Sequence, residues 1–503
     1  MPSASPLKIS RLPFYVLAGV LAAYLVLVAL HGRLLNVDEV FYKAAGTHWA
    51  LDGHFAAPEI VGRLPFDPPI EKVFACYPPL YSFVFGVFVC TWGFGHMQVC
   101  LFDALLRVLL CVVTAHTVRR LIPNSSSAWP AAVAGLLVLP LGAIGRPDDL
   151  AVIWGMLACT RLLPLSTLSR CFQGGILLGL SAATSLVAAG VMAAVATGLV
   201  FTEAGASYSQ RIGRVVLMGV VSAMVLVMAF VPLLCIDGHA WRQIIDHGAD
   251  NVRTGGFLET WQVAWHNGRY TMVASGGVVV AALLLFAWAM RMGVGITWLR
   301  WCPAALIMIA LIILKTGGKY YYIWFAGPWL VAVCVALIAQ AWTNSIHRGL
   351  AFAAAVALAG GGIYGAQFWV VERLVVSSFT PEQRFEAAAA RINAVVPVGA
   401  TVMAFEHWVT LVGRNPIRDH TISTPENTWG PIDYIVLTGN GSREPGVAQL
   451  HPPAFINYAA AYFEKIDDNL ALEPLRLCGV RITRSAYGWG AVIYRRVEKA
   501  KAE

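Results

Sequence analysis

The sequence predicts a polytopic α-helical membrane protein of about eleven transmembrane helices, followed by a small C-terminal α/β domain. Three observations support this fold class. Of the 503 residues, 58% are hydrophobic and 13% are charged, whereas a soluble domain carries about 25% charged residues. Apolar runs of about 20 residues, long enough to cross a bilayer as helices, recur along the first three quarters of the chain. After residue 371 charged residues become frequent and the apolar runs shorten.

The first predicted span covers residues 11–31 and is entered from Lys8 and Arg11. Its apolar stretch is too long for a cleaved signal peptide, and no small-residue cleavage site follows it. We therefore expect a retained helix with a cytoplasmic N-terminus. Further spans are expected at 98–118, 128–145, 150–165, 213–235, 271–290, 301–314, 320–341 and 350–371, with two short crossings in 172–201 that break near Ser185–Gly190.

The distribution of charge orients these spans. Residues 372–503 hold 14 acidic and 14 basic residues, so the net charge of +8 comes from residues 1–371. Basic residues collect in the expected cytoplasmic loops, as the positive-inside rule predicts. Twelve of the 14 acids of residues 1–371 fall in the expected outer loops. This pattern indicates a lipid bilayer rather than nucleic acid as partner, and an odd number of spans places the C-terminus outside the cytoplasm.

The segment Tyr77–Gly95 is apolar enough to span, but as a crossing it would place Arg119 and Arg120 outside. We expect instead a helix at the outer interface, opened by Pro78 and Pro79. The outer loop 32–97 then carries interfacial helices, and a second outer loop covers 237–270. The ten cysteines include no C-x-x-C pair, and most sit in apolar segments, where they are expected to be small core residues. Those cysteines are Cys90, Cys100, Cys111, Cys159, Cys171 and Cys334.

Residues 372–503 read as a small α/β domain outside the membrane. Pro381–Val396 has the pattern of an amphipathic helix. Short strands are expected at Ala400–Phe405, Asp433–Thr438 and Ala491–Tyr494, between turns rich in Gly, Pro and Asn.

Two pairs of acids fall on the predicted outer face, each at the end of a span. Asp38 and Glu39 follow the first span, and Asp148 and Asp149 follow Arg146 and Pro147 at a later one. One interpretation is that acids at the start of a helix complement its dipole. Acids near the membrane, however, tend to mark function. Two pairs on one face would supply a general base together with a charge or metal partner.

Cations on the same face suit an anionic ligand. The segment Lys315–Tyr322 is the densest group, and it fits both an interfacial belt and a clamp for a lipid phosphate. His266 and Arg269 form either a second phosphate contact or a solvated helix start. Other cations of the expected outer face are Lys43, Arg63, Lys72, Arg146 and Arg242.

Four motifs on this face occur in a characteristic order. They are Asp38-Glu39, Pro78-Pro79-Leu80-Tyr81, Arg146-Pro147-Asp148 and Lys319-Tyr320-Tyr321-Tyr322. In this order they resemble the GT-C glycosyltransferases that use polyprenyl-phosphate sugars, specifically the protein O-mannosyltransferase and lipid A aminoarabinose transferase group. The resemblance covers about residues 10–371. It implies a GT-C-like catalytic domain over residues 1–371 and an extracytoplasmic domain over 372–503.

The resemblance also implies roles for the acids. Asp38 would be the general base of a direct displacement at the anomeric carbon, which inverts that carbon, and Glu39 would orient the site. Asp148 would assist acceptor binding or, with Asp38, hold a divalent cation, Mg²⁺ or Mn²⁺. Tyr77, Lys315, Lys319 and Tyr321 fall where family members contact the donor phosphate, and Arg146, Arg269 and His266 are added as cations of the same face.

One position departs from the family pattern. The aminoarabinose enzymes have an arginine three residues after the first-loop acid, where this chain has Phe41. Lys43 lies two helix positions further on and would face elsewhere. The sequence therefore leaves the donor sugar open.

The expected function is transfer of a sugar from a polyprenyl-phosphate donor to a hydroxyl of a glycan, lipid or protein, at the outer face of a bacterial inner membrane. A transporter or flippase for a lipid-linked or anionic solute is the main alternative. Transporters tend to show interrupted helices at mid-depth and internal repeats, and the sequence has no internal repeat. A scaffold without activity is a third reading, which the presence of both Asp38 and Asp148 disfavours.

Overall fold

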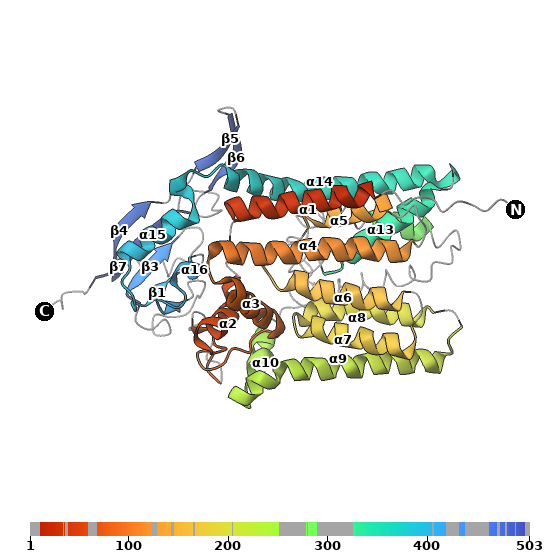
Figure 1. Ribbon diagram of the computed structural model, residues 1–503, viewed down its shortest axis with the longest axis horizontal. Coiled ribbons are helices and arrows are strands. Elements are labelled where there is room, and N and C mark those ends of the chain that lie inside the picture. The colour runs from red at the N-terminus through yellow and green to blue at the C-terminus, as the bar shows by residue number, and fades with distance from the viewer. Residues whose placement is uncertain are drawn as a thin grey trace, which may run out of the picture.

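The computed structural model shows a bundle of long helices with a mixed β-sheet at one end (Figure 1). The sheet and the first residues of α1 (Leu12–His31) lie at opposite ends of the bundle. The structure describes residues 11–33, 35, 39–58, 68–122, 128–141, 145–163, 166–203, 205–250, 278, 280–288, 325–343, 345–404, 407–418, 432–437, 462–469, 473–477, 480–487 and 489–497.

Four described helical stretches are long and apolar enough to cross a membrane, at residues 12–31, 96–121, 208–236 and 345–363. They belong to α1, α4 (His96–Leu121), α9 (Tyr208–Ile236) and α14 (Arg348–Ser377). The protein is therefore a multi-pass membrane protein. Further helices of the bundle are α5 (Ala128–Val138), α6 (Asp148–Leu162), α7 (Leu168–Ala182), α8 (Leu186–Phe201) and α13 (Gly327–Trp342). The count of eleven spans stays a prediction, because the expected span 301–314 lies outside the described residues.

The predicted break within 172–201 is confirmed. Helix α7 ends before Ala183, and Ser185 caps α8 by accepting a hydrogen bond from the backbone N–H of Ala188, as serine does at many helix starts. Helix α5 is shorter than the expected span 128–145, since it ends at Val138, ahead of Pro140. A proline disfavours helical geometry in the residue before it, so helices tend to stop there.

Helices α2 (Glu39–Asp52) and α3 (Leu80–Trp92) pack together at the end of the bundle nearest the sheet (Figure 1). Helix α3 begins directly after Pro79, where the sequence predicted its start. The two helices approach closely at Gly46 and Gly86, because a Cβ on either glycine would lie less than 3 Å from a backbone oxygen of the other helix. Helix α10 (Trp241–Asp250) follows α9 at the same end (Figure 1).

The C-terminal region contains the predicted helix and strands. A 3-10 turn (Pro381–Gln383) and α15 (Phe385–Val395) fill the expected helical range. A five-stranded mixed sheet has the order β2-β1-β3-β7-β4. In it β1 runs parallel to β2 and β3, whereas β7 is antiparallel to β3 and β4. The elements are β1 (Val402–Met403), α16 (Trp408–Leu411), β2 (Ile417–Arg418), β3 (Tyr434–Leu437), β4 (Phe463–Asn469) and β7 (Ala491–Arg496), with a separate hairpin of β5 (Glu473–Leu477) and β6 (Val480–Tyr487).

The sheet region contacts the start of α4, and α14 is bonded to the end of α1. His96, at the start of α4, stacks on Phe385 with ring centroids 4.2 Å apart, and its edge meets Trp489 at 5.4 Å. Arg373, near the end of α14, donates a hydrogen bond of 2.9 Å to the carbonyl of Gly32, just past α1. The division of the chain at residue 371 stays a prediction, and α14 continues through that position to Ser377.

The expectation for the cysteines holds for five of the six that were named and is wrong for Cys90, which is exposed on α3. An apolar residue of a membrane helix can face lipid as well as the core, and composition does not distinguish the two. Among the described cysteines, Cys235 on α9 is exposed too.

Replacing Gly46 by alanine is expected to destabilise the packing of α2 on α3. The new Cβ would lie 2.0 Å from the carbonyl oxygen of Ser82, a backbone atom that cannot rotate away. Overpacking of this kind costs about 1–3 kcal/mol, so the Tm of the purified protein in detergent should fall. Gly190→Ala is the matched control, because a Cβ there meets nothing within 4 Å among the described residues. Equal Tm values for the two variants would contradict the close contact.

Acidification is expected to weaken the sheet region. His407 is buried beside Phe385 and Trp489, and burial lowers the pKa of His407 to about 4. An unfolded histidine has a pKa of about 6.5. The unfolded chain therefore binds the proton more readily, and the free energy of unfolding should fall as the pH drops from about 6.5 towards 4. Denaturation at several pH values tests this, and His407→Phe should lose less stability over that interval than the wild type.

Candidate functional site

Four of the predicted site residues are described, namely Glu39, Tyr77, Arg146 and Asp148. The other six, Asp38, His266, Arg269, Lys315, Lys319 and Tyr321, lie outside the described residues. Their roles therefore stay predictions.

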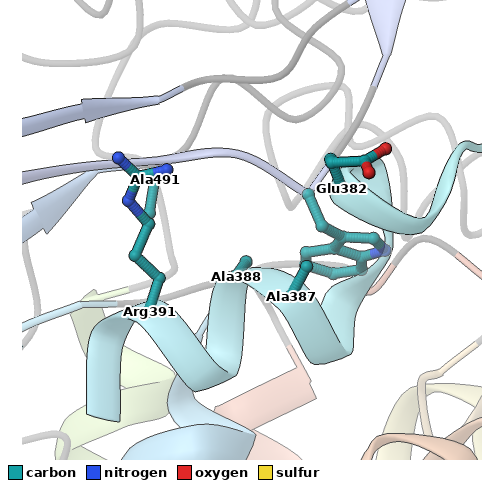
Figure 2. A pocket seen from close by; sticks show the side chains of 6 residues that line it. Glu382, Ala387, Ala388, Arg391 and Ala491 are labelled. Atoms are coloured by element: carbon teal, nitrogen blue, oxygen red, sulfur yellow. The ribbon is translucent and has the colours of Figure 1, made fainter. Parts of the chain in front are cut away.

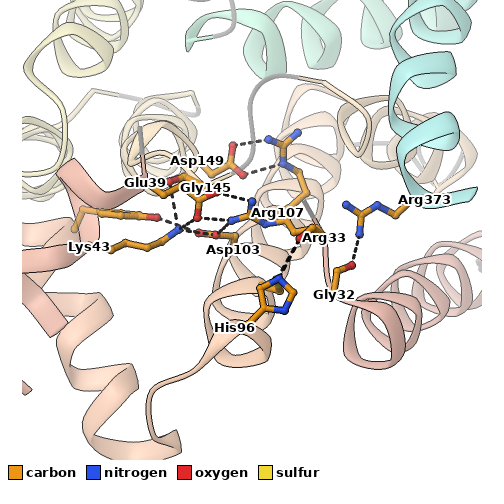
Figure 3. Close-up of polar contacts among 12 residues, drawn as sticks. Gly32, Arg33, Glu39, Lys43, His96, Asp103, Arg107, Gly145, Asp149 and Arg373 are labelled. Atoms are coloured by element: carbon orange, nitrogen blue, oxygen red, sulfur yellow. Dashed lines mark hydrogen bonds and ion pairs between the residues drawn. The ribbon is translucent and has the colours of Figure 1, made fainter. Parts of the chain in front are cut away.

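Glu39 belongs to a group of four charged side chains that is almost completely buried (Figure 3). Arg33 donates hydrogen bonds of 2.6 and 2.7 Å to the two carboxylate oxygens of Glu39 and a further one to Asp103. Lys43 donates to Glu39 at 2.6 Å and to Asp103 at 2.7 Å. Each cation thus contacts both anions, and the exposed fraction of each residue is 2% or less. We call Arg33, Glu39, Lys43 and Asp103 the ion quartet.

The ion quartet joins elements that are far apart in the sequence. Arg33 follows α1, whereas Glu39 and Lys43 stand one turn apart on α2, where i and i+4 share a face. Asp103 lies on α4, and Tyr81 of α3 donates a hydrogen bond of 3.0 Å to it. Arg33 and Asp103 were not predicted from the sequence as site residues. The available signal was the charge of Asp103 inside the expected span 98–118, since ionisable residues within membrane spans are rare and functional.

The environment of Glu39 keeps it ionised. Burial alone would raise the pKa of Glu39, but the adjacent Arg33 and Lys43 outweigh that effect and hold the pKa below its usual value. Both of its oxygens accept hydrogen bonds from these two cations. An arrangement of this kind suits a residue that orients the site rather than one that takes up a proton.

Lys43 does not lie on the outer face, where the sequence predicted it. It was predicted as a cation of the outer face that would hold an anion. The prediction is wrong, because the side chain is fully buried and its ammonium group is bonded to Glu39 and Asp103. A lysine one turn after a glutamate on a buried helix face pairs inside the protein.

The two acidic loops meet at Gly145. The ammonium group of Lys43 lies 3.3 Å from the carbonyl oxygen of Gly145, to which it donates (Figure 3). Gly145 has a φ of +93°, and a Cβ there would lie 2.5 Å from the carboxyl carbon of Glu39. Both facts require glycine at this position. The loop that carries Asp148 therefore packs directly on the side chain that follows Asp38 in the sequence.

The second acidic pair divides into two environments. Asp149 turns inward and receives two hydrogen bonds from Arg107 of α4, of 2.8 and 3.0 Å (Figure 3). The side chain of Asp148 keeps 16% of its surface exposed and accepts a bond of 3.1 Å from Arg146. Asp148 thus remains next to solvent at the start of α6, whereas Asp149 ties α6 to α4.

Tyr77 and Arg146, two predicted donor-phosphate contacts, both touch Tyr42. The ring centroid of Tyr77 is 4.8 Å from that of Tyr42, and the Arg146 guanidinium lies 5.3 Å from the Tyr42 ring centroid. The structure therefore places these two candidates around one aromatic ring of α2, one residue before Lys43 in the sequence.

Among the described residues, no group of three or more His, Cys, Asp or Glu side chains would hold a metal ion. Asp148 offers one partly exposed carboxylate, which suits a hard divalent cation. Its expected partner Asp38 lies outside the described part of the chain. The Mg²⁺ or Mn²⁺ site therefore stays a prediction.

A cavity of about 280 Å³ lies in the C-terminal region, away from the ion quartet, between α15 and the start of β7 (Figure 2). Its lining includes Glu382, Arg391 and Trp489. Arg391 is already paired with Asp467 of β4, and Trp489 is almost fully buried. Arg391 and Trp489 therefore have structural roles in the C-terminal region.

Replacing Glu39 by glutamine is expected to destabilise the protein strongly. The change leaves two buried cations with Asp103 as the one remaining anion of the ion quartet, and removing one partner of a buried pair costs about 3–5 kcal/mol. Thermal or denaturant unfolding in detergent measures this loss. Glu464→Gln is the control, because Glu464 pairs with Arg495 with about half of each side chain exposed, where such pairs contribute about 0–1 kcal/mol. A loss for Glu39→Gln no larger than the control would contradict the buried geometry.

No known protein family matches the sequence, and no curated protein is similar to it in sequence. Solved structures do match its fold. ArnT from Cupriavidus metallidurans bound to undecaprenyl phosphate aligns with a TM-score of 0.58 and 13% identity, over 97% of this chain and 99% of that one. The same ArnT in the apo state gives a TM-score of 0.54 and 14% identity, over 96% and 97%.

A third match is the archaeal oligosaccharyltransferase AglB from Archaeoglobus fulgidus, in complex with an inhibitory peptide and a dolichol-phosphate. It aligns with a TM-score of 0.50 and 13% identity, over 90% of this chain and 69% of that one. At such low identities the matches establish the fold. The chain therefore shares the fold of ArnT and of AglB, which agrees with the fold that the resemblance of its four motifs implied.

Proposed function

We propose that this protein is an inverting glycosyltransferase that moves a sugar from a polyprenyl-phosphate donor to an acceptor hydroxyl at the outer face of a bacterial inner membrane. The contact of the two acidic loops carries the proposal, since Gly145 packs against Glu39 at one end of a GT-C fold. The ligands of the matched structures, undecaprenyl phosphate on ArnT and a dolichol-phosphate on AglB, support a lipid phosphate as donor. The fold likeness also favours a transferase over the transporter alternative.

Asp38 is the proposed general base. Its neighbour Glu39 is ionised, and both of its oxygens are occupied by Arg33 and Lys43, which leaves Asp38 as the carboxylate of this pair for proton transfer. Asp38 takes the proton of the acceptor hydroxyl while the hydroxyl oxygen bonds to the anomeric carbon. The bond from that carbon to the phosphate oxygen breaks, the polyprenyl phosphate leaves with the electron pair, and the sugar is inverted.

The second loop supplies the partner groups of this reaction. Asp148 assists the acceptor or would hold a divalent cation together with Asp38, and such an ion would supply positive charge to offset the charge that develops on the phosphate. Arg146 and Tyr77, which meet at Tyr42, contact the donor phosphate from one side. Positive charge aimed at the leaving group stabilises the transition state more than the ground state. The remaining proposed donor contacts are His266, Arg269, Lys315, Lys319 and Tyr321.

Asp38→Asn is expected to abolish transfer while donor binding stays within a few-fold of wild type, because only the base is lost. General bases contribute about 10²–10⁴-fold to turnover. The assay uses the full-length protein in nanodiscs with undecaprenyl- or decaprenyl-phosphate mannose, glucose, arabinose and aminoarabinose, and it measures donor binding and sugar release or transfer. Asp52→Asn, which changes an exposed acid at the end of α2, should keep wild-type turnover.

The outcomes of this assay separate the parts of the proposal. Wild-type turnover in Asp38→Asn would remove Asp38 as base. Failure of the wild-type protein to bind any of these donors would contradict a polyprenyl-phosphate donor. That result would favour the transporter alternative.

A further inference from the structure

We infer that Lys43 and Asp103 are positioning residues that hold the loop of Asp38 against the loop of Asp148, an inference that rests on the proposed function for its kinetic consequence. Neither residue is expected to touch donor or acceptor, because both are buried. Their contacts reach both acidic loops, and three observations lead to this assignment.

The two residues that flank the first acidic loop are bonded to one another. Arg33 and Glu39 bracket residues 34–38, and two hydrogen bonds from the Arg33 guanidinium to the Glu39 carboxylate join the two ends. The carbonyl of Arg33 also lies 3.2 Å from Nε2 of His96, and that of Gly32 accepts from Arg373. Asp38 is the residue before Glu39 in the sequence, so what fixes Glu39 is expected to restrict Asp38 as well.

Asp103 connects the first acidic loop to the membrane bundle. One of its oxygens receives hydrogen bonds from both Arg33 and Lys43, and the other receives the hydroxyl of Tyr81. Asp103 stands within α4, a helix of 26 residues of which 16 are buried. A long, packed helix is a rigid support, and rigid supports are what precise positioning of reacting groups requires.

Lys43 connects the first acidic loop to the second acidic loop. Its ammonium group has three protons and three acceptors, which are Glu39, Asp103 and the carbonyl of Gly145. Gly145 stands three residues before Asp148. Lys43 therefore holds the backbone of the second loop at the carboxylate of the first, and this contact sets the separation of the two loops.

The charge balance of the ion quartet makes a clean test possible. Two cations and two anions leave no net charge, and removal of one member leaves an unpaired buried charge that costs about 3–5 kcal/mol. Removing one of each sign, in Lys43→Met/Asp103→Asn, keeps the Arg33–Glu39 pair and the charge balance. This double variant should fold better than either single variant while losing the link to Gly145.

We expect Lys43→Met/Asp103→Asn to lower kcat by at least about tenfold, since small misplacements of reacting groups cost up to about 10²-fold, while the donor Kd changes little. Hydrogen exchange of residues 33–47 and 145–150, measured without donor, should become faster. Gly145→Ala keeps every charge and pushes the second loop away from Glu39, so it should give the same split between kcat and Kd.

The control is Glu203→Gln/Arg214→Met, which removes a partly buried ion pair at the opposite end of the bundle, between α8 and α9 (Figure 1). It should leave kcat and the exchange of both loops unchanged. Any global effect of losing an ion pair would appear in this variant as well.

The results distinguish the inference from the proposed function. Wild-type kcat and unchanged exchange in Lys43→Met/Asp103→Asn would overturn the positioning role, with the glycosyltransferase proposal intact. Parallel losses of Tm, donor binding and kcat would likewise overturn it, because they indicate a purely structural role. If the wild type transfers no sugar from any donor but exchange rises in the double variant and not in the control, the link between the loops is supported and the proposed function fails.

Discussion

A buried, electrically neutral ion quartet is the constraint on which the rest of this end of the molecule depends. Arg33, Glu39, Lys43 and Asp103 lose nearly all contact with solvent, and such desolvation is tolerable only when every charge has well-placed partners. Each member has two of opposite sign. The helices that supply them therefore have one arrangement that satisfies all four charges, and this arrangement brings the end of α1 and the starts of α2 and α4 together.

The surroundings of the ion quartet extend this order outwards. Lys43 and Gly145 bring in the second acidic loop, whose Arg146 rests on Tyr42 beside Tyr77. On the other side, Arg373 of α14 donates a hydrogen bond to the carbonyl of Gly32. The carbonyl of Arg33 lies next to His96, which stacks on Phe385 of the C-terminal region. His96 thus joins Phe385 of the C-terminal region to the backbone of Arg33, a member of the ion quartet.

Local patterns predicted many of the described helices and three of the strands, but not β2, β4, β5 or β6. Long apolar runs predicted the helices, Pro79 the start of α3, and Ser185 the break between α7 and α8. Part of the site was predictable, because the sequence placed two acidic pairs at span ends on the same predicted face. Side chains on one face can act on the same ligand. The contact of Gly145 with Glu39 agrees with this.

The partners of these acids were not predictable in the same way. Averaged hydropathy hides Asp103 and Arg107 inside an apolar helix, and their partners lie about 40 to 70 positions away in the sequence. Neighbouring residues of a helix point about 100° apart, so Asp148 and Asp149 face different surroundings, and the position of Arg107 on α4 decides which one turns inward. Lys43 looked like an outer cation because its acceptors Asp103 and Gly145 are distant in the sequence.

The most direct test of this account measures whether residues 38 and 148 face one another. Cysteines replace Asp38 and Asp148 in a protein whose exposed native cysteines, such as Cys90 and Cys235, are changed to alanine. A short bifunctional thiol reagent is applied in nanodiscs, and mass spectrometry identifies the joined peptides. The account predicts an efficient cross-link between residues 38 and 148 that is lost when Lys43→Met/Asp103→Asn is added. Absence of the cross-link in the otherwise unaltered protein would contradict it.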